Sequence, residues 1–208
     1  MQKLNSLLFT FLIIFINTLN AADKYVIFNE LINKIDDSKR LKVEYFNDNL
    51  SDNLSGNSGD NIGSIYIEKS NKYRIDLGQR IIASDGKTVW NYDLKNQKVI
   101  ITNFENDEGQ ISIPNILMNL KNNYKPHTLK KNHHSSGAEN IWMLELVSKA
   151  DGSKIELILN KNHKLRHITF SSEEFVQSWE IKSLHFNPPR LNVLKLSDDS
   201  KFDIIDLR

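Results

Sequence analysis

The feature that most constrains the fold is an alternation of apolar and polar residues with a period of two. Successive side chains of a β-strand point to opposite faces, so each alternating segment predicts a strand with one buried face. Turn signals such as Asp85-Gly86 and Asp151-Gly152 separate the segments. Short strands joined by turns predict an antiparallel meander. The alternating segments are Leu41–Tyr45, Ile65–Ile67, Tyr73–Leu77, Trp142–Leu146, Ile155–Leu159, Ile168–Phe170 and Trp179–Ile181.

Two segments have helical spacing instead. The first begins near Asp23, a candidate N-cap, and continues with apolar residues on one face up to Ile35. The second follows Ser112 and has Pro114 in its first turn, with apolar residues at helical spacing up to Leu120. A helix inserted into a meander has to bury its apolar face against the sheet, so this helix is a natural cover for one side of the sheet.

Residues 1–21 predict a secretory signal peptide. Lys3 supplies a short positive region, the apolar run Leu7–Ile16 follows, and Ala21 and Ala22 are small residues at the expected cleavage site. The apolar run is shorter than the ~20 residues that span a bilayer, because Asn17 and Asn20 interrupt the sequence before it reaches that length. We expect cleavage after Ala21; cleavage one residue later and an uncleaved membrane anchor are the alternatives.

Composition narrows the function of the remaining chain, which we expect to form one domain over residues 22–208. The chain contains no cysteine, so an exported form has neither disulfides nor a cysteine for N-terminal acylation. Residues 1–21 hold one lysine and no acid, so without them 26 Lys and Arg balance 26 Asp and Glu. Zero net charge argues against nucleic acid binding and gives no attraction to anionic membranes.

A curved antiparallel sheet with a large apolar face either fills its interior with its own side chains or holds a ligand there. Filling is the usual outcome, and on that interpretation Trp90, Trp142 and Trp179 are ordinary core residues. The alternation alone leaves the choice between a filled core and a ligand cavity open.

The segment Gly63–Leu94 resembles the LolA family of periplasmic lipoprotein carriers. The family motif Ser-Asp-Gly-Lys-Thr-Leu-Trp-x-Tyr is nearly intact here as Ser84-Asp85-Gly86-Lys87-Thr88-Val89-Trp90-Asn91-Tyr92. The resemblance is specific over residues 41–120 and continues as a strand pattern beyond residue 140. The segment Phe202–Asp206 is similar to the closing strand of the family, with Asn187-Pro188-Pro189 as a competing match.

The resemblance implies an α+β fold: an incomplete, strongly curved antiparallel β-barrel, or half-barrel, in which about three helices form a lid over a hydrophobic cavity. It implies a monomeric periplasmic carrier without cofactor or catalytic activity. Such a carrier shields the acyl chains of lipoproteins released by an inner-membrane ABC exporter, and delivers them to an outer-membrane receptor where one is present. The alternative is a periplasmic module that senses lipids or lipoproteins on the same half-barrel.

The resemblance also suggests site residues. In the family an arginine followed by proline links the sheet to the lid, and the matching positions here are Lys69 and Ser70. Lysine keeps the charge but has fewer donors, so Lys69 is a candidate lid latch, with a solvated strand-end lysine as the alternative. The expected lipid-binding cavity is lined by Ile65, Ile67, Tyr73, Ile75, Trp90, Tyr92, Ile116, Leu117, Leu120, Trp142 and Leu144.

Catalytic and metal chemistry find little support in the sequence. His133-His134 lies in a polar segment without a third ligand at useful spacing, and His163 and His167 flank a predicted strand. The serines lack the context of a nucleophile elbow, and Glu173-Glu174 is most simply a charged turn. We expect these histidines to be exposed to solvent and the protein to have no metal site.

Overall fold

The computed structural model describes residues 23–47, 62–104, 112–132, 141–191, 194–196 and 199–208. The predicted signal peptide, His133-His134 and several predicted turns lie outside these residues. Two α-helices are present in the described part, one over residues 23–37 (the N-terminal helix) and α2 over Ile113–Asn123. Within that part, neither helix is both long and apolar enough to cross a membrane.

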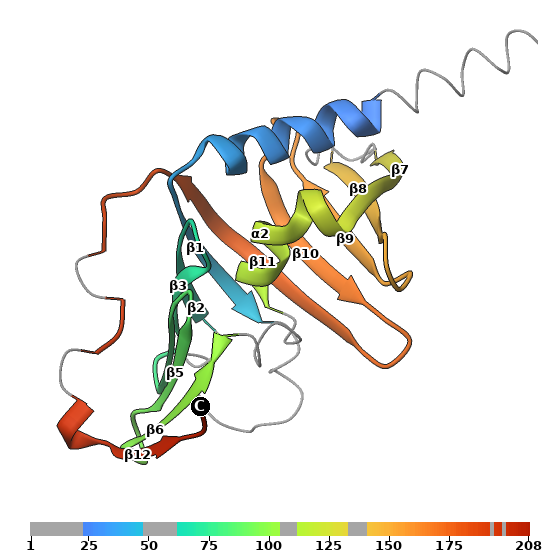
Figure 1. Cartoon of the computed structure of the whole chain (residues 1–208). Coiled ribbons are helices and arrows are strands. Elements are labelled where there is room, and N and C mark those ends of the chain that lie inside the picture. Colours follow the sequence, from blue (N-terminus) through green and yellow to red (C-terminus); the bar gives the residue numbers. More distant parts are fainter. Residues whose placement is uncertain (1–22, 48–61, 105–111, 133–140, 192–193, 197–198) are drawn as a thin grey trace, which may run out of the picture.

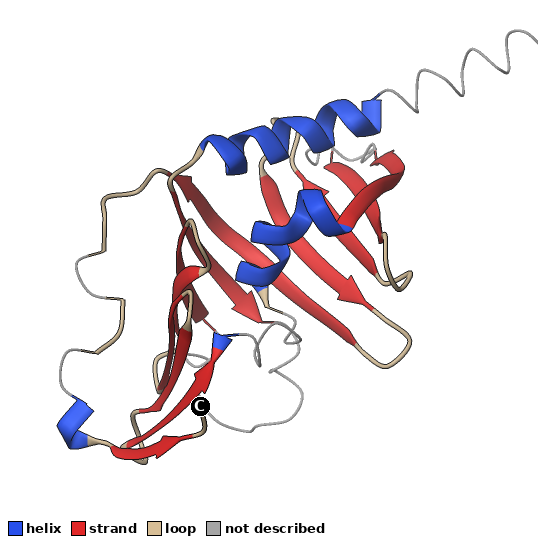
Figure 2. Ribbon diagram, viewed as in Figure 1, coloured by secondary structure: helices blue, strands red, loops and turns tan. Residues whose placement is uncertain are grey.

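All strands of the described residues belong to one sheet (Figures 1 and 2). The strands are β1 (Arg40–Asn47), β2 (Ile62–Glu68), β3 (Lys72–Asp76), β4 (Arg80–Asp85), β5 (Thr88–Asp93), β6 (Lys98–Asn103), β7 (Tyr124–Asn132), β8 (Ile141–Ser148), β9 (Lys154–Leu159), β10 (Leu165–Ser171), β11 (Val176–Phe186) and β12 (Asp203–Asp206).

The sheet is a long meander in the order β12-β6-β5-β4-β3-β2-β1-β11-β10-β9-β8-β7. Neighbouring strands are antiparallel, as expected, except that β12 pairs with β6 in parallel. Strands β7 and β12 form the two edges, so the sheet is open and does not close into a barrel. Pro126 fits this arrangement, because proline is tolerated on an edge strand such as β7.

Both helices pack on one face of the sheet, which we call the concave face (Figure 2). The N-terminal helix contributes Phe28, Leu31, Ile32 and Ile35, which the sequence predicts on one face, and α2 contributes its own apolar residues. They form one buried cluster with apolar residues of eight strands of the sheet. Fully burying one aliphatic side chain contributes about 1.5–3 kcal/mol, so this layer is the main source of stability.

The ends of α2 are stabilised by side chains on both sides. Ser112 is the N-cap and its side-chain oxygen accepts a hydrogen bond from the backbone N–H of Asn115. At the other end, the ammonium group of Lys149 donates to the backbone carbonyls of Lys121 and Asn122 at 3.0 and 2.9 Å. These contacts define where the cover begins and ends over the sheet.

The expectation of about three helices is wrong for the described residues, which contain two. Near the C-terminus the chain forms only a short 3₁₀ turn, η3 (Asp199–Lys201), before β12. The physical reason is that this segment is tied to the sheet by β12 and by contacts on the other face, so its backbone groups pair there and not within a helix.

Candidate functional site: the latched cover of the concave face

The Ser84–Tyr92 motif builds the hairpin between β4 and β5. The Asp85 carboxylate accepts hydrogen bonds from the backbone N–H groups of Lys87 and Thr88, both at 2.9 Å. Gly86 has a φ of +90°, and a Cβ there would collide with the backbone carbonyl oxygen of Ser70. The motif is therefore structural in this chain, and it places the hairpin directly against the turn between β2 and β3.

The turn between β2 and β3 explains the departure from the family pattern at Lys69 and Ser70. Ser70 and Asn71 have φ values of +66° and +59°. Proline, which the family has after the basic residue, is fixed near a φ of −65° and cannot adopt this backbone. The turn has a different backbone from the one a Lys-Pro or Arg-Pro sequence would give, and it still directs Lys69 toward the helical cover.

Lys69 links the sheet to the cover. Its ammonium group donates a hydrogen bond to the backbone carbonyl of Asp36 at 2.8 Å. Asp36 lies in the last turn of the N-terminal helix, where carbonyl groups without helical partners favour a cation. The contact agrees with the sequence hypothesis of a latch at Lys69; whether it controls ligand release stays a prediction.

Asp36 also joins the two helices to each other. Its carboxylate forms an ion pair with Lys121 of α2 at 2.8 Å, and both side chains are about half exposed. Asp36 thus contacts the sheet through its backbone and α2 through its side chain. We call the three residues Asp36, Lys69 and Lys121 the latch cluster. Exposed ion pairs contribute only about 0–1 kcal/mol each, so the cluster is weak enough to open.

The other end of the N-terminal helix is fastened by separate polar contacts. Lys24 donates to the backbone carbonyl of His127 in β7 at 2.8 Å. Glu30 lies 2.9 Å from the His163 ring nitrogen Nδ1, and the same ring packs edge-on against Trp142 with centroids 5.6 Å apart. The sequence predicts a solvent-exposed His163, and the structure shows its side chain 27% exposed because the helix partly covers it. No local pattern predicts this contact, since its partners are 133 residues apart.

Beneath the cover, most of the predicted cavity residues lie together. Eight of them belong to the buried cluster and are at most 7% exposed: Ile65, Ile67, Tyr73, Ile75, Ile116, Leu117, Leu120 and Leu144. Trp142 is partly buried and packs at the margin of the same cluster. In the closed structure these side chains contact one another, so the apolar surface is a filled core when the cover is in place.

Trp90 and Tyr92 are the exceptions, because they lie on the opposite, convex face. They pack in a second cluster with Ile81, Val99 and Ile101. In a strand, residues one position apart face opposite sides, and Val89 of β5 belongs to the concave cluster. Their placement in the predicted cavity is therefore wrong.

The aromatic residues of the motif hold the C-terminal segment on the convex face. The Lys195 ammonium lies 5.1 Å from the centroid of the Trp90 ring, and the rings of Tyr92 and Phe202 meet edge-on at 5.2 Å. Cation–π and edge-to-face contacts of this kind stabilise by about 0.5–1.5 kcal/mol each. These two aromatic residues thus act as a platform for the C-terminal segment and do not line the lid.

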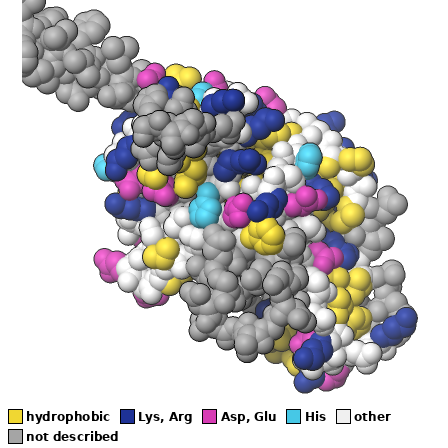
Figure 3. Space-filling model, turned by 180° about the vertical axis from the view of Figure 1, so that it is seen from behind, with side chains coloured by type: hydrophobic (Ala, Val, Ile, Leu, Met, Phe, Trp, Pro, Cys, Tyr) yellow, Lys and Arg dark blue, Asp and Glu magenta, His cyan; other side chains and the backbone are white. Residues whose placement is uncertain are grey.

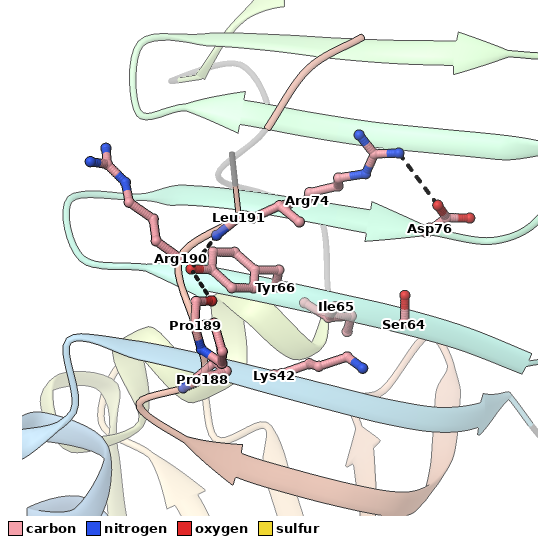
Figure 4. A pocket seen from close by; sticks show the side chains of 10 residues that line it. All are labelled: Lys42, Ser64, Ile65, Tyr66, Arg74, Asp76, Pro188, Pro189, Arg190 and Leu191. Atoms are coloured by element: carbon pink, nitrogen blue, oxygen red, sulfur yellow. Dashed lines mark hydrogen bonds and ion pairs between the residues drawn. The ribbon is translucent and has the colours of Figure 1, made fainter. Parts of the chain in front are cut away.

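A pocket of about 640 Å³ also lies on the convex face, where residues 188–191 pass over β1–β3 (Figure 4). The Tyr66 hydroxyl donates to the Pro189 carbonyl at 3.2 Å and accepts from the Leu191 N–H at 2.9 Å. Burial raises the pKa of the Tyr66 hydroxyl above its ordinary value. Each cation that lines the pocket has an acidic partner: Arg74 pairs with Asp76 at 3.5 Å, Lys42 with Glu44 and Arg190 with Glu68.

A smaller pocket of about 400 Å³ adjoins the latch cluster. Its apolar lining comes from Ile35, Leu41, Ile67 and Met118, and Lys69 lies at its margin. Three of these apolar residues also belong to the buried concave cluster, and Met118 packs against it. The pocket is therefore an opening that leads from solvent, beside the latch, toward the concave face.

Among the described residues no group of three or more His, Cys, Asp or Glu side chains could hold a metal ion. Every buried side-chain nitrogen or oxygen in that part of the chain has a hydrogen-bond partner. On the face seen in Figure 3, basic and acidic side chains are interspersed and do not form a single basic stripe. The arrangement is suited to covering and uncovering an apolar surface.

Comparisons of the chain with known proteins find a family model and several solved structures. A family model described as "Outer membrane lipoprotein carrier protein LolA" matches residues 45–182. No curated protein sequence matches the chain. A crystal structure of an uncharacterized conserved protein from Thermus thermophilus is similar in fold, with a TM-score of 0.52 and 13% identity over 86% of this chain and 98% of that one. The Pseudomonas aeruginosa MucA/MucB complex matches at a TM-score of 0.34 and 11% identity, over 82% of this chain and 59% of that chain.

Proposed function

The chain belongs to the LolA family of outer membrane lipoprotein carrier proteins, and from this premise we propose that it carries lipoproteins by shielding their acyl chains. LolA-family carriers are periplasmic and are not enzymes. We propose the same compartment for this chain, with residues 1–21 as a signal peptide and residues 22–208 as the carrier domain. The cargo is collected from an inner-membrane ABC exporter and delivered to the outer membrane, to a receptor where one is present, by a monomer.

The observation that supports this function best is the latch cluster over a large apolar face. The contacts that hold the cover at its margin are polar and mostly exposed, whereas the contacts beneath it are mainly apolar. Breaking the polar contacts costs little, because water replaces them. Lifting the cover without a ligand would expose the core side chains, which costs several kcal/mol.

An acyl chain changes that balance. Each CH₂ group removed from water contributes about 0.8 kcal/mol, so a chain that replaces the helices against the sheet offsets the cost of opening. A filled core that opens only for cargo also limits affinity, because part of the binding energy is used to displace the cover. This is what a carrier needs, since it has to release its cargo without an energy source of its own.

Binding of a synthetic triacylated lipopeptide tests the proposal. We expect saturable binding of the lipopeptide by the purified protein in calorimetry, and no binding of the same peptide without acyl chains. Equal binding of both peptides, or no binding of either, would contradict the carrier function.

The latch is tested by Lys69→Leu, which removes the hydrogen bond to Asp36. We expect faster lipopeptide loading and release in stopped-flow measurements, by about threefold to tenfold for a loss of about 1 kcal/mol. Lys95→Leu is the matched control, because Lys95 is an exposed lysine in the turn between β5 and β6, at the other end of β5 from the hairpin that meets Ser70. If Lys69→Leu leaves loading and release unchanged, Lys69 is not a latch.

A further inference from the structure

The concave face continues beyond the helical cover. Figure 1 shows both helices in front of the strands around β9–β11, whereas β4–β6 and β12 extend past them toward the lower left of the view. We call β8–β11 the covered part of the sheet and β4–β6 with β12 the bare part. The bare part ends at the open edge strand β12.

The strand register places one row of side chains across the concave face of both parts. Ile65 pairs with Ile75, Ile75 with Ile82, Ile82 with Asn91, Asn91 with Ile100, and Ile100 with Ile205. Paired residues of neighbouring strands point to the same face, so these side chains form a line perpendicular to the strands. We call it the isoleucine row.

Exposure rises along the isoleucine row. Ile65 is 1% exposed and Ile75 7%, Ile82 is partly buried against the core cluster, and Ile100 and Ile205 are each 39% exposed. The row therefore leads from the filled core to solvent, with Asn91 as a polar member between Ile82 and Ile100. Isoleucines exposed in this way are unfavourable for the free protein, and the paired Ile100 and Ile205 form an exposed apolar patch of the kind that indicates a binding site.

The length of the row's exposed end matches one acyl chain. From Ile82 to Ile205 the row crosses three inter-strand steps, about 14 Å at the usual strand spacing. The hydrocarbon core of a bilayer is about 30 Å thick and holds two layers of acyl chains, so one chain occupies about 15 Å. An acyl chain is long enough to lie along the exposed isoleucines and reach the margin of the core.

Asn91 is the polar member of the row, and its polarity is partly compensated. The Arg80 guanidinium donates to the Asn91 side-chain oxygen at 3.1 Å. An acceptor that is already bonded costs less to bury under an apolar ligand than a free one. The row can therefore be covered by a hydrocarbon chain without leaving an unpaired carbonyl oxygen.

We propose that the outer end of the isoleucine row, from the partly buried Ile82 to the exposed Ile100 and Ile205, binds one acyl chain of the cargo outside the helical cover. This inference rests on the proposed carrier function. It divides the cargo between two places: chains that displace the cover lie against the covered part, and one further chain lies on the bare part. A cargo with three chains then needs less opening of the cover than a cargo buried entirely beneath it.

Single-cysteine labelling tests the location, because the chain contains no cysteine of its own. Ile205→Cys and Ile204→Cys are labelled with an environment-sensitive fluorophore such as NBD. Ile204 is the matched control, since it is the adjacent residue of β12, is 50% exposed and points to the convex face. The triacylated lipopeptide should raise and blue-shift the emission at position 205 and leave position 204 unchanged.

Binding measurements with unlabelled variants give the size of the effect. Ile100→Ser combined with Ile205→Ser should weaken lipopeptide binding about tenfold or more, since two apolar contacts are lost. Ile204→Ser should stay within about twofold of the wild type. Circular dichroism of each variant checks that the fold is kept, and exposed positions tolerate such changes.

The outcomes separate the inference from the function on which it rests. If the wild-type chain binds no lipopeptide, the carrier function itself fails. If the wild type binds and the double variant binds equally well, the carrier function stands and the proposed acyl-chain site on the bare part is wrong. If the emission changes at both labelled positions and light scattering shows a larger particle, the β12 edge pairs with a second copy of the chain. The proposed acyl-chain site is then also wrong.

Discussion

The covered and bare parts of the sheet have the same alternation of apolar residues but differ in how far those residues are buried. In the covered part Leu144, Leu157 and Ile168 are completely buried. In the bare part Ile100 and Ile205 face the same side and are 39% exposed. The difference does not come from the strands, because the apolar side chains are equally large. It comes from the helices, which reach one part and not the other. Alternation thus specifies which residues share a face, whereas the cover decides whether that face is core or surface.

This difference has a functional meaning under the proposed carrier role. The covered part stabilises the fold and is available to cargo only after the helices move. The exposed isoleucines on the concave side of the bare part contribute little to stability and are available at all times. Substitutions in the two parts should therefore separate stability from binding, and the following predictions test that separation in order of decreasing effect.

The largest expected effect is a loss of stability in the covered part. Leu144→Ala removes a completely buried side chain and should lower the free energy of unfolding by about 2–5 kcal/mol. Ile100→Ala in the bare part should lower it by less than about 1 kcal/mol. Urea unfolding of both variants measures the difference, and equal destabilisation would remove the distinction between the two parts.

Alkaline pH should destabilise the core through Tyr45. Burial raises the pKa of the Tyr45 hydroxyl to about 12, above the value of about 10 in the unfolded chain. The folded state favours the protonated form, so this stabilisation is complete below pH 10 and is lost as the pH rises to 12. Across that window the loss is about 3 kcal/mol.

Tyr45→Phe isolates this contribution from other tyrosines such as Tyr66 and Tyr124, whose pKa values are also raised. The variant should show a smaller loss of stability between pH 10 and pH 12 in denaturant titrations. A wild type and a variant with the same alkaline profile would contradict the assignment.

Substitution of Gly86, in the hairpin that supports the latch, should lower the stability of the protein more than substitution of Gly78. Gly86→Ala adds a side chain at a positive φ and against the Ser70 carbonyl, and should cost about 2–3 kcal/mol. Gly78→Ala has a similar positive φ with open space around the new Cβ, and should cost about 1 kcal/mol. Thermal unfolding compares them. A Gly86 variant as stable as the Gly78 variant would show that contact with the β2–β3 turn is unimportant.

The smallest effect on stability is expected at the latch cluster. Lys69→Leu and Lys121→Leu should each change the free energy of unfolding by less than about 1 kcal/mol, because the contacts of these lysines with Asp36 are exposed. Native-state hydrogen exchange should nevertheless show faster exchange in the C-terminal turn of the N-terminal helix. Unchanged exchange there would mean that the cluster does not hold the cover.

Much of the fold follows from the sequence because alternation is a local signal. The strands containing Val43, Ile65, Tyr73, Leu144, Leu157 and Trp179 are present as predicted. The predicted alternating segments do not include β4, β6 or β7. In β6, Val99 and Ile101 face the C-terminal segment while Ile100 faces the concave side, so apolar residues on both faces hide the period. Strand β7 lies at an edge of the sheet, where Pro126 and several lysines are tolerated, and these residues also hide the period of two.

The sequence likewise predicts the part of the candidate site that depends on local periodicity and misses the part that does not. Nine of the eleven cavity residues lie on or beside the concave cluster because they follow the strand and helix periods. Trp90 and Tyr92 do not lie on the concave face. The motif predicts that they share one face of a strand, but it does not indicate which face of the sheet is concave. The contacts of Asp36 with Lys69 and Lys121 join segments that are far apart in the chain, so only the family resemblance at Lys69 indicated any of them.

Movement of the cover during loading tests the central claim most directly. Asn33→Cys on the exposed side of the N-terminal helix and Arg166→Cys on β10 introduce the two cysteines of the chain, and spin labels there report the distance between helix and sheet. Pulsed electron paramagnetic resonance should show a longer and broader distance distribution when the triacylated lipopeptide is bound than in the free protein. A distribution that stays unchanged while calorimetry shows the lipopeptide bound would contradict a cover that opens for acyl chains.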